Sequence, residues 1–515
     1  MVPEFRNEPL SDFSDSQQRS AMEAALRQVA DEFEREWPLV IGGQRVTSGA
    51  WIESFDPCHR ERRVGRVAKA GQSEAQRALD AAWTAFSEWS RWRPDERARL
   101  LLKAAALMRR QKHLFSATMV YEAGKTWPEA DGDTAEAIDF LEFYAREALR
   151  LAQPLVMPRL AGEDNELVYQ PLGVGVVIPP WNFPCAITVG MTAAALVTGN
   201  TAILKPASVT PLIAARFVAL LEEAGIPAGV INFLPGGGSE IGDFLVGHPR
   251  TRFISFTGSR EVGTHIYALA AQVQQGQRWL KRVIAEMGGK DAIVVDETAD
   301  LAAAAEGIAT SAFGFQGQKC SAASRAIVLE PVYQDVLSQV ARRTEALRVG
   351  PAEDPMTQVA AVIDENQFKK VMSFMPIGQG EGRLVVGGEP DGQDGWYIHP
   401  TVFADIPEDG TLAQEEIFGP VLSFIRARDY DHALEIANNT DYGLTGGVYS
   451  RDRQRLERAR SEFHVGNLYL NRKITGAMVG AQPFGGFNMS GTDSKAGGPD
   501  YLQLFMQSKV VVERF

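Results

Sequence analysis

Short apolar segments alternate with longer helix-like stretches from residue 174 onward, and this alternation constrains the fold more than any other feature. The apolar runs at 174–178, 201–204, 230–234 and 253–256 are predicted strands. Helices are predicted near 186–197, from 211 to 224, and up to residue 270. Such alternation is typical of βαβ units, whose strands form a parallel sheet. Ligands of these sheets bind at the carboxyl ends of the strands, so functional residues are expected there.

The rest of the chain shows a second alternating region and a helical beginning. Further strands are predicted at 292–295, 326–329, 421–426, 445–449 and 467–470. The first 40 residues are predicted to be helical, and so is most of 74–150. The tail at 508–515 reads as a lone edge strand. Such a strand leaves backbone groups unpaired, and a second subunit could pair with it.

Charge and composition exclude several classes of protein. The formal net charge is −13, which argues against a nucleic-acid binder or a protein of anionic membranes. The three cysteines form no CxxC pair and the histidines no HxxxH or HExxH motif, so no metal is expected. The uncharged stretch 167–204 is interrupted by proline and asparagine, which favours buried core over a membrane span. The acidic N-terminus shows no targeting signal, and we expect a cytoplasmic protein.

Cys320 is the strongest candidate nucleophile. It lies in the Gly/Gln-rich segment GFQGQKCSA, between a predicted helix and a predicted strand. A rigid turn between two elements is where scaffolds place a reactive group. The alternative is a small buried hydrophobic residue, which is the usual state of a free cysteine. That alternative is favoured for Cys185, whereas Cys58 in a polar loop reads as incidental.

Two further polar residues occupy the ends of predicted strands. Glu286 closes the apolar run VIAE and precedes two glycines, so it would be partly desolvated and mobile, as suits a general base. It could equally be a carboxylate facing water. Asn182 lies in the proline-stiffened loop PPWNFP, where a rigid amide could stabilise an oxyanion. Its alternative role is that of an ordinary turn residue.

Evidence for a nucleotide from glycines alone is weak. The usual dinucleotide motif GxGxxG is missing from the chain. Nevertheless, Lys205 closes one predicted strand, where a ribose or phosphate is expected. Thr257, Gly258 and Ser259 end another strand and open a helix, which is a natural anion site.

Six motifs taken together are far more specific than any single residue. PWNFP, LKPAS, FTGS, AEMGGK, FGFQGQKCSA and EEIFGP occur in this order. Over roughly residues 40–515 the chain resembles the aldehyde dehydrogenase superfamily. The segment 471–486, with TGA and QPFGG, is similar to the 1-pyrroline-5-carboxylate dehydrogenase family, which oxidises glutamate γ-semialdehyde to glutamate in proline catabolism.

The resemblance implies an architecture of three parts. The fold would be α/β, with a Rossmann-variant cofactor domain at 1–151 and 172–286 that includes an N-terminal helical arm. An α/β catalytic domain would span 287–477. A small β oligomerisation flap would comprise 152–171 and 478–515. Its hairpin-like stretch at 156–170 and the C-terminal strand would pair between subunits, giving a homodimer or a multiple of dimers.

The resemblance also implies catalytic roles. Cys320 would attack the aldehyde, and Asn182 with the Cys320 backbone N–H would hold the oxyanion. Hydride would pass to a nicotinamide cofactor, leaving a thioester, and Glu286 would activate water to hydrolyse it. The helix before Cys320 presents its C-terminal end, so its dipole would not favour a thiolate. Activation must then come from the fold or the cofactor.

Cofactor residues follow from the same resemblance. The matched positions are Ile178, Pro179, Trp181, Lys205, Ser208, Gly238, Thr257, Gly258, Ser259, Glu416 and Phe418. Lys205 would contact the adenosine ribose, Trp181 and Ser259 the pyrophosphate, and Glu416 with Phe418 the nicotinamide half. Ser208 stands where many NAD-preferring relatives have Glu, and a serine would not repel a 2′-phosphate. NAD is therefore expected, with NADP possible as well.

A carboxylate-bearing substrate is implied by another set of positions. Ser321, Gly476 and Ala477 would bind the carboxylate through a hydroxyl and two backbone N–H groups. Phe183 and Phe484 would enclose the aliphatic chain. Glu136, within the predicted helix 133–150, would lie near the substrate amino group; the alternative is a carboxylate exposed to solvent.

Three other functions remain open at this stage. The chain could oxidise another semialdehyde or a simple aldehyde within the same superfamily. It could be a non-redox cysteine acyl-transfer enzyme, although such enzymes commonly pair cysteine with histidine and none is near Cys320 in sequence. It could also be a non-catalytic binding protein. The expected partners are a small-molecule substrate and, functionally, a proline dehydrogenase, with no nucleic acid and no membrane.

Overall fold

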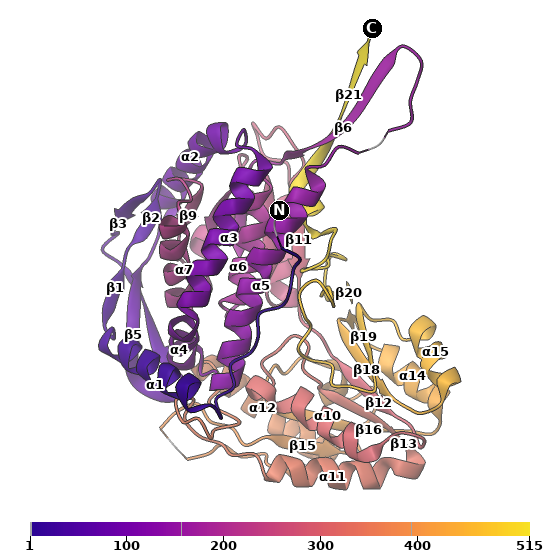
Figure 1. The fold of residues 1–515 in the computed structure, drawn as a ribbon. Coiled ribbons are helices and arrows are strands. Elements are labelled where there is room, and N and C mark those ends of the chain that lie inside the picture. The colour runs from indigo at the N-terminus through magenta and orange to yellow at the C-terminus, as the bar shows by residue number, and fades with distance from the viewer. Residues whose placement is uncertain (1–2, 156, 393) are drawn as a thin grey trace.

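The structure, a computed structural model, describes residues 3–155, 157–392 and 394–515. Two lobes pack against each other, and a two-stranded arm projects from the first of them (Figure 1). Each lobe contains a seven-stranded sheet covered by helices. The α/β fold predicted from the alternation of strands and helices is therefore confirmed.

The first lobe contains a mainly parallel sheet with the strand order β11-β10-β7-β8-β9-β2-β3. Neighbouring strands from β11 to β9 are parallel, whereas β2 joins β9 and β3 in antiparallel fashion. The strands are β2 (Leu39–Ile41), β3 (Gln44–Val46), β7 (Val174–Ile178), β8 (Thr201–Leu204), β9 (Ile231–Phe233), β10 (Phe253–Thr257) and β11 (Arg282–Glu286). All four strands predicted between 174 and 256 are present and lie in this sheet.

Helices cover both faces of the first sheet. They are α2 (Gln72–Trp89), α3 (Pro94–Arg110), α4 (Lys112–Ala123), α5 (Trp127–Leu151), α6 (Ala186–Val197), α7 (Pro211–Ala224), α8 (Asp243–Gly247) and α9 (Arg260–Ala271). Val174 and Val176 pack in the cluster that contains α2 and α8, whereas Val177 joins the cluster of α3, α5, α6 and α7. Because successive strand residues face opposite sides, a continuous apolar run marks a strand buried on both faces.

The N-terminal region is only partly helical. Helix α1 (Ser16–Asp31) ends before Glu34, whose positive φ of 67° turns the chain into β1 (Arg35–Trp37). The prediction of helix over the first 40 residues is confirmed only for Ser16–Asp31; it is wrong for residues 3–15 and beyond Asp31. Strand β1 joins β5 (His59–Ala68) and β4 (Trp51–Asp56) in a separate three-stranded sheet. The predicted helical region 74–150 is confirmed as α2 to α5.

The second lobe repeats the architecture with a sheet of order β14-β15-β16-β13-β12-β18-β19. Its strands are β12 (Ala292–Val295), β13 (Arg325–Leu329), β14 (Arg383–Val386), β15 (Thr401–Ala404), β16 (Val421–Ala427), β18 (Thr445–Tyr449) and β19 (Asn467–Leu470). The helices are α10 (Leu301–Phe313), α11 (Tyr333–Glu345), α12 (Glu365–Glu381), α13 (Thr411–Gln414), α14 (Tyr430–Asn438) and α15 (Arg453–Glu462). All five strands predicted between 292 and 470 are confirmed here.

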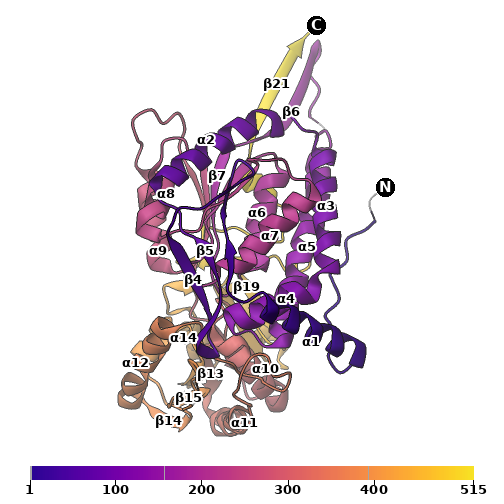
Figure 2. The same ribbon diagram turned by 90° about the vertical axis from the view of Figure 1, so that its left-hand side faces the viewer.

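The arm consists of β6 (Glu163–Pro171) and β21 (Met506–Arg514), which pair antiparallel along their whole length. It extends away from both lobes in Figures 1 and 2. The prediction that the C-terminal tail is a lone edge strand is therefore wrong, because β6 of the same chain pairs with it. The predicted hairpin-like stretch begins at Val156, which lies outside the described residues. Pairing of the arm with a second subunit stays a prediction.

The remaining elements are short. Strands β17 (Tyr442–Gly443) and β20 (Phe487–Asn488) pair with each other, and single helical turns occupy Gly238–Gly242, Gly314–Gly317, Glu330–Val332 and η4 (Tyr501–Phe505). Within the described ranges, no helix has the length and apolar character needed to cross a bilayer. Most of the uncharged stretch 167–204 supplies β7, α6 and β8, which are buried in the first lobe as expected. The prediction of buried core is wrong for residues 167–171, which belong to β6 of the arm and are partly exposed.

Candidate active site

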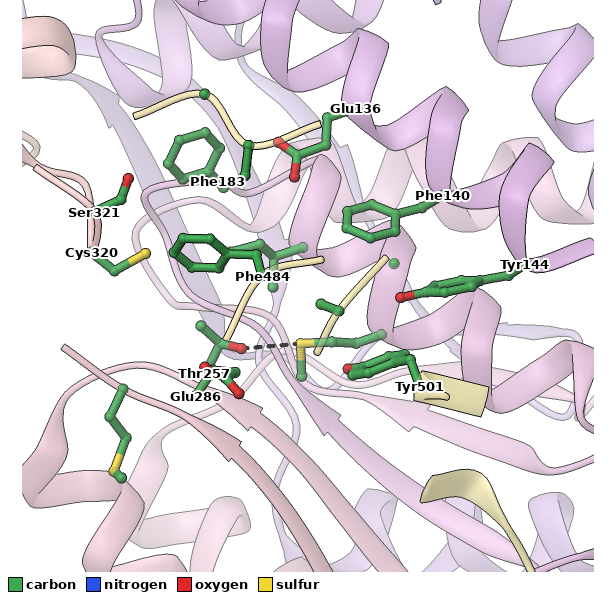
Figure 3. Close-up of a pocket in the computed structure, with 17 residues that line it drawn as sticks. Glu136, Phe140, Tyr144, Phe183, Thr257, Glu286, Cys320, Ser321, Phe484 and Tyr501 are labelled. Carbon is green, nitrogen blue, oxygen red and sulfur yellow. Dashed lines mark hydrogen bonds between the residues drawn. The ribbon is translucent and has the colours of Figure 1, made fainter. Parts of the chain in front are cut away.

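One pocket gathers residues from both lobes and from the C-terminal segment (Figure 3). It contains Cys320 and Glu286, together with the six residues predicted to bind substrate: Glu136, Phe183, Ser321, Gly476, Ala477 and Phe484. These eight residues come from positions far apart in the sequence. Strand β11 contributes Glu286 and strand β10 contributes Thr257, each from its carboxyl end. The pocket thus lies where ligands of parallel sheets bind.

Cys320 lies in the loop that follows α10. Phe315 and Gln316 in this loop have positive φ values of 49° and 57°, so the backbone bends sharply. The buried Gln316 side chain fixes the bend by donating to the carbonyls of Gly124 and Ala361 at 3.1 and 2.8 Å. Figure 3 shows the Cys320 sulfur directed into the pocket. In the described chain the Cys320 backbone N–H has no protein acceptor, so it can donate to a ligand.

The surroundings of Cys320 favour the neutral thiol. Burial raises the pKa of Cys320 well above its ordinary value, and the carboxyl groups of Asp291 and Glu416 raise it further. These effects oppose ionisation because a buried anion beside other carboxylates is poorly solvated. The expectation that the helix dipole does not create a thiolate agrees with this environment.

Asn182 joins the two loops that border the nucleophile. It lies between β7 and α6, is almost fully buried, and donates from Nδ2 to the carbonyl of Gln318 at 3.0 Å. A primary amide carries two N–H groups, so one stays free after this bond is made. Asn182 is therefore fixed in orientation with a spare donor, as an oxyanion site requires.

Glu286 is desolvated and held by two donors. The backbone N–H of Gly486 donates to Oε2 at 3.1 Å, and the Ser494 hydroxyl donates to Oε1. Burial raises the pKa of Glu286 to about 8, although both hydrogen bonds and the nearby Lys495 act in the opposite direction. A carboxyl with a pKa near neutrality can exchange protons with water at physiological pH.

One end of the pocket offers three donors without protein partners. The Ser321 hydroxyl and the backbone N–H groups of Gly476 and Ala477 make no hydrogen bond to any residue that the structure describes. Gly476 has a positive φ of 75°. N–H and O–H donors that line one pocket and lack protein partners can hold an anion.

Glu136 faces the pocket from α5 (Figure 3). Burial raises the pKa of Glu136 to about 8, and the carboxyl of Asp133 one turn earlier adds to the effect. The alternative of a carboxylate on the solvent face of the helix is wrong, because this side chain lines the cavity.

Sequence reasoning missed an aromatic wall on the far side of the pocket. Phe140 and Tyr144 follow Glu136 at intervals of four residues on α5, and Tyr144 stacks on Tyr501 with ring centroids 5.5 Å apart. The four-residue spacing on one helix face was a signal that could have found Phe140 and Tyr144. Nothing local distinguishes Tyr501, which reaches the pocket from the C-terminal segment.

A buried ion pair was also missed. Lys125 and Asp133 are fully buried and lie 3.0 Å apart. The Lys125 ammonium lies 4.0 Å from the ring centroid of Phe183 and 4.3 Å from that of Phe315. It therefore contacts the Asn182 loop and the Cys320 loop together, and Asp133 also accepts from the N–H of Ala186 at 2.6 Å.

A second cavity in the first lobe contains three of the predicted cofactor residues, namely Ile178, Lys205 and Gly238. Lys205 is 7% exposed and has no acceptor or ion-pair partner in the described ranges. Burial lowers the pKa of Lys205 to about 8. A buried cation without a partner is costly unless a ligand supplies acceptors. Ribose hydroxyls of a nucleotide would do so.

The other cofactor candidates occupy several places. Trp181 and Phe418 pack edge to face with ring centroids 5.4 Å apart. Glu416 accepts from the Gly289 N–H at 3.0 Å, and burial raises the pKa of its carboxyl.

The remaining candidates lie around the ends of the strands in the first lobe. Pro179 is buried beside Ile178, Gly258 donates its N–H to the Glu286 carbonyl, and Ser259 caps the N-terminus of α9. Thr257 lines the Cys320 pocket instead of the Lys205 cavity, and Ser208 is exposed.

These residues fit a dinucleotide. Lys205 offers donors, Glu416 offers acceptors, and the N-terminus of α9 offers N–H groups for phosphate oxygens. The Gly288 backbone approaches the Glu416 carboxylate so closely that a Cβ at position 288 would lie 2.1 Å from Oε1. A larger residue at position 288 would displace the Glu416 carboxylate from its place where the two lobes meet.

Comparison with known proteins identifies the class to which this site belongs. The model of the aldehyde dehydrogenase family matches residues 45–511. The chain belongs to the aldehyde dehydrogenase family. Within that family it is 60% identical over 515 residues to the 1-pyrroline-5-carboxylate dehydrogenase of Geobacillus kaustophilus strain HTA426, with both chains covered completely.

Solved structures give the same result. The 1-pyrroline-5-carboxylate dehydrogenase from Thermus with bound NAD has a TM-score of 0.99 and 55% sequence identity, with all of each chain covered. Proline utilization A from Bdellovibrio bacteriovorus has a TM-score of 0.98 and 44% identity, covering all of this chain and 54% of that one.

Proposed function

We propose that this chain oxidises L-glutamate γ-semialdehyde, formed from 1-pyrroline-5-carboxylate, to L-glutamate in proline catabolism, with NAD as the hydride acceptor. The carrying observation is the pocket that combines Cys320 with three unpartnered donors at Ser321, Gly476 and Ala477. A hydroxyl and two N–H groups are what a substrate carboxylate needs. The full-length relatives named 1-pyrroline-5-carboxylate dehydrogenase support the same assignment.

Substrate binding uses both ends of the pocket. Ser321, Gly476 and Ala477 bind the carboxylate, and the rings of Phe183 and Phe484 enclose the aliphatic chain. Glu136 binds the substrate ammonium, which favours the ionised form of this carboxyl. These contacts orient the aldehyde carbon toward the Cys320 sulfur.

The first chemical step forms a thiohemiacetal. The Cys320 thiol releases its proton to a water molecule, and its sulfur bonds to the aldehyde carbon while the carbonyl π bond breaks, which places negative charge on the aldehyde oxygen. The free N–H of Asn182 and the backbone N–H of Cys320 stabilise that charge. Loss of hydride from the carbon would leave a thioester on Cys320, and NAD, when bound, would supply the nicotinamide that takes up the hydride.

The second step hydrolyses the thioester. Glu286 takes a proton from water, and the resulting hydroxide equivalent attacks the thioester carbon. The carbon–sulfur bond breaks, L-glutamate is released, and the Cys320 thiolate that leaves takes up the proton held by Glu286. The ionised form of Glu286 is needed, so its raised pKa makes this step depend on pH.

The cofactor would bind between the lobes. Lys205 would contact the adenosine ribose, Ser259 and Trp181 the pyrophosphate, and Glu416 with Phe418 the nicotinamide half. Ile178, Pro179, Ser208, Gly238, Thr257 and Gly258 complete the proposed set. Because Ser208 is exposed and uncharged, it leaves room for a 2′-phosphate, and we expect NADP to be used beside NAD.

The proposed assembly is a cytoplasmic homodimer or a multiple of dimers. Residues 1–151 and 172–286 form the cofactor domain, 287–477 the catalytic domain, and 152–171 with 478–515 the oligomerisation element. The match to proline utilization A supports a functional link to a proline dehydrogenase.

Steady-state reduction of NAD and NADP with three substrates tests the proposal. We expect turnover with 1-pyrroline-5-carboxylate to exceed turnover with succinate semialdehyde and propanal, and to disappear in Cys320→Ala. Turnover with the simple aldehydes alone would refute the carboxylate pocket. Failure to reduce or bind either cofactor would point to a non-redox cysteine enzyme instead.

A further inference from the structure

A segment of the C-terminal region wraps around the end of β11. Residue Glu286 forms an antiparallel bridge with Gly491, Met287 donates to the Ser490 carbonyl at 2.7 Å, and Thr492 donates to the Ala285 carbonyl at 2.9 Å. Strand β11 is the edge strand of its sheet. The segment 485–494 therefore covers an edge that would otherwise be open.

Glycines make room for the Glu286 carboxylate within this segment. A Cβ at Gly485 would lie 2.9 Å from Glu286 Oε1, and a Cβ at Gly491 would lie 3.0 Å from both carboxylate oxygens. The Gly486 N–H donates to Oε2. We name Gly485, Gly486 and Gly491 the glycine cage; a larger residue at any of these positions would displace the carboxylate or the segment.

Ser494 makes the one side-chain hydrogen bond to this carboxylate in the described chain. It is 2% exposed, so water does not compete for its hydroxyl. A hydroxyl that donates to a carboxylate favours the ionised form and fixes its position.

We propose that Ser494 is a positioning residue for the general base, holding the ionised Glu286 carboxylate in the glycine cage at the edge of the pocket until the thioester forms. The proposal rests on the function proposed above. It extends that function, because the Ser494 hydrogen bond would then help to set the pH range in which the thioester is hydrolysed. Ser494 does not line the pocket, and it would touch neither substrate nor cofactor.

Four other titratable groups of the described chain lie close enough to affect the charge of Glu286. Lys495 and Asp493 come from the same segment, Tyr501 comes from η4, and Cys320 comes from the opposite loop. Lys495 favours the ionised form and donates to the Gly466 carbonyl at 2.8 Å, whereas Asp493 disfavours it. All four are retained in Ser494→Ala, so a changed pH profile reports the lost hydroxyl.

Single-turnover kinetics with enzyme in excess separate the two chemical steps. The absorbance of reduced cofactor reports hydride transfer, and acid quenching at successive times reports decay of the acyl-enzyme. The hydrolysis rate should fall at low pH as Glu286 takes up a proton. In Ser494→Ala we expect this fall to occur about one pH unit higher, because loss of a charge-assisted hydrogen bond raises the pKa of Glu286. Hydrolysis near pH 7 then slows about tenfold, while the hydride-transfer rate is unchanged.

Two control variants distinguish positioning of the Glu286 carboxylate by Ser494 from a general effect on the structure of segment 485–494. Ser494→Thr keeps the hydroxyl and should restore the wild-type profile. Ser490→Ala removes another fully buried hydroxyl of the same segment, which accepts from the Gly443 N–H at 3.0 Å and does not contact Glu286. It should leave the profile unchanged.

The outcomes distinguish this inference from the proposed function. An unchanged profile in a folded Ser494→Ala, or an equal shift in Ser490→Ala, overturns the role of Ser494. Glu286→Gln should retain hydride transfer and accumulate acyl-enzyme; normal hydrolysis in that variant would remove Glu286 as the base. Absence of any turnover by the wild type with 1-pyrroline-5-carboxylate would count against the proposed function itself.

Discussion

Two residues of the pocket, a thiol and a carboxyl group, have pKa values that are both set by burial. Cys320 and Glu286 both lie among buried groups, and burial raises the pKa of each. Burial thereby favours the neutral thiol of Cys320, whereas the pKa of Glu286, about 8, lies close enough to neutrality for the general base that we propose. Ser321, Gly476 and Ala477 line the same pocket and offer uncharged donors to a ligand.

Ser321 provides the first residue-scale prediction. Ser321→Ala should raise KM for the semialdehyde about ten- to a hundredfold, because a charge-assisted hydrogen bond worth about 1.5–3 kcal/mol is lost. KM for propanal, which has no carboxylate, should not change. Initial-rate measurements with both aldehydes check this. A parallel rise in both KM values would show that Ser321 supports the loop instead of the substrate.

Glu286 provides a prediction about pH. Its folded pKa of about 8 exceeds the ordinary value of 4.5, so the folded state binds the proton more tightly than the unfolded state does. Its contribution to stability should therefore be present at low pH and be lost as the pH rises from about 4.5 through about 8, while hydrolysis accelerates over the upper part of that window. Urea unfolding of the wild type and Glu286→Gln at about pH 5 and pH 9 measures the difference. Equal pH dependence in both proteins would contradict the prediction.

Secondary-structure elements position the pocket residues through contacts between segments far apart in the sequence. Helix α5 begins beside the Cys320 loop and presents Glu136, Phe140 and Tyr144 to the pocket. At its start, Asp133 holds the Lys125 ammonium between the rings of Phe183 and Phe315. The ion pair thus connects α5 to both loops that border the nucleophile.

The Lys125–Asp133 pair provides a prediction about stability at the scale of these elements. Lys125→Met should destabilise the fold by about 3–5 kcal/mol, because Asp133 loses its partner in a site without water. The double variant Lys125→Met/Asp133→Asn should recover part of that loss. Urea unfolding measures both. Arg19→Met, which breaks the exposed Arg19–Glu23 pair on α1, is the control and should cost less than about 1 kcal/mol.

The whole molecule combines two lobes with an arm that has little to pack against in one chain. Val510 and Val512 lie on the same side of β21 and are 60% and 56% exposed. Large apolar side chains gathered on an exposed arm indicate an interaction surface. A second subunit is the occupant that we expect.

Oligomeric state therefore provides the prediction at this scale. Val510→Asp/Val512→Asp should shift sedimentation from a dimer or larger assembly toward the monomer, since buried charge opposes association. Val273→Asp, at a 64% exposed position outside the arm, should leave the assembly unchanged. An unchanged assembly in the double variant would mean that association uses another surface.

The sequence by itself determined the central strands of both sheets and the candidate nucleophile, but it did not predict β2, β3, β14 or β15. The strands at 174–178 and 201–204 and the helices at 186–197 and 211–224 have the predicted bounds, because apolar runs, proline and glycine act over a few residues. Six motifs also identified the family, since each is a short run of consecutive residues that can be recognised without knowledge of tertiary contacts.

Only the tertiary structure decided how that chemistry is supported. Ser494, Tyr501 and Lys125 have no distinctive local pattern. Tyr501 lines the pocket, whereas Ser494 acts on it through a hydrogen bond to Glu286 and Lys125 through its contact with the Phe183 ring, and both contacts join segments far apart in the sequence. Chain topology also gave the C-terminal strand a partner within its own chain, where the sequence predicted a lone edge. The physical reason is that desolvation and hydrogen bonding of a buried group depend on everything packed around it, whereas propensity depends on its neighbours in sequence.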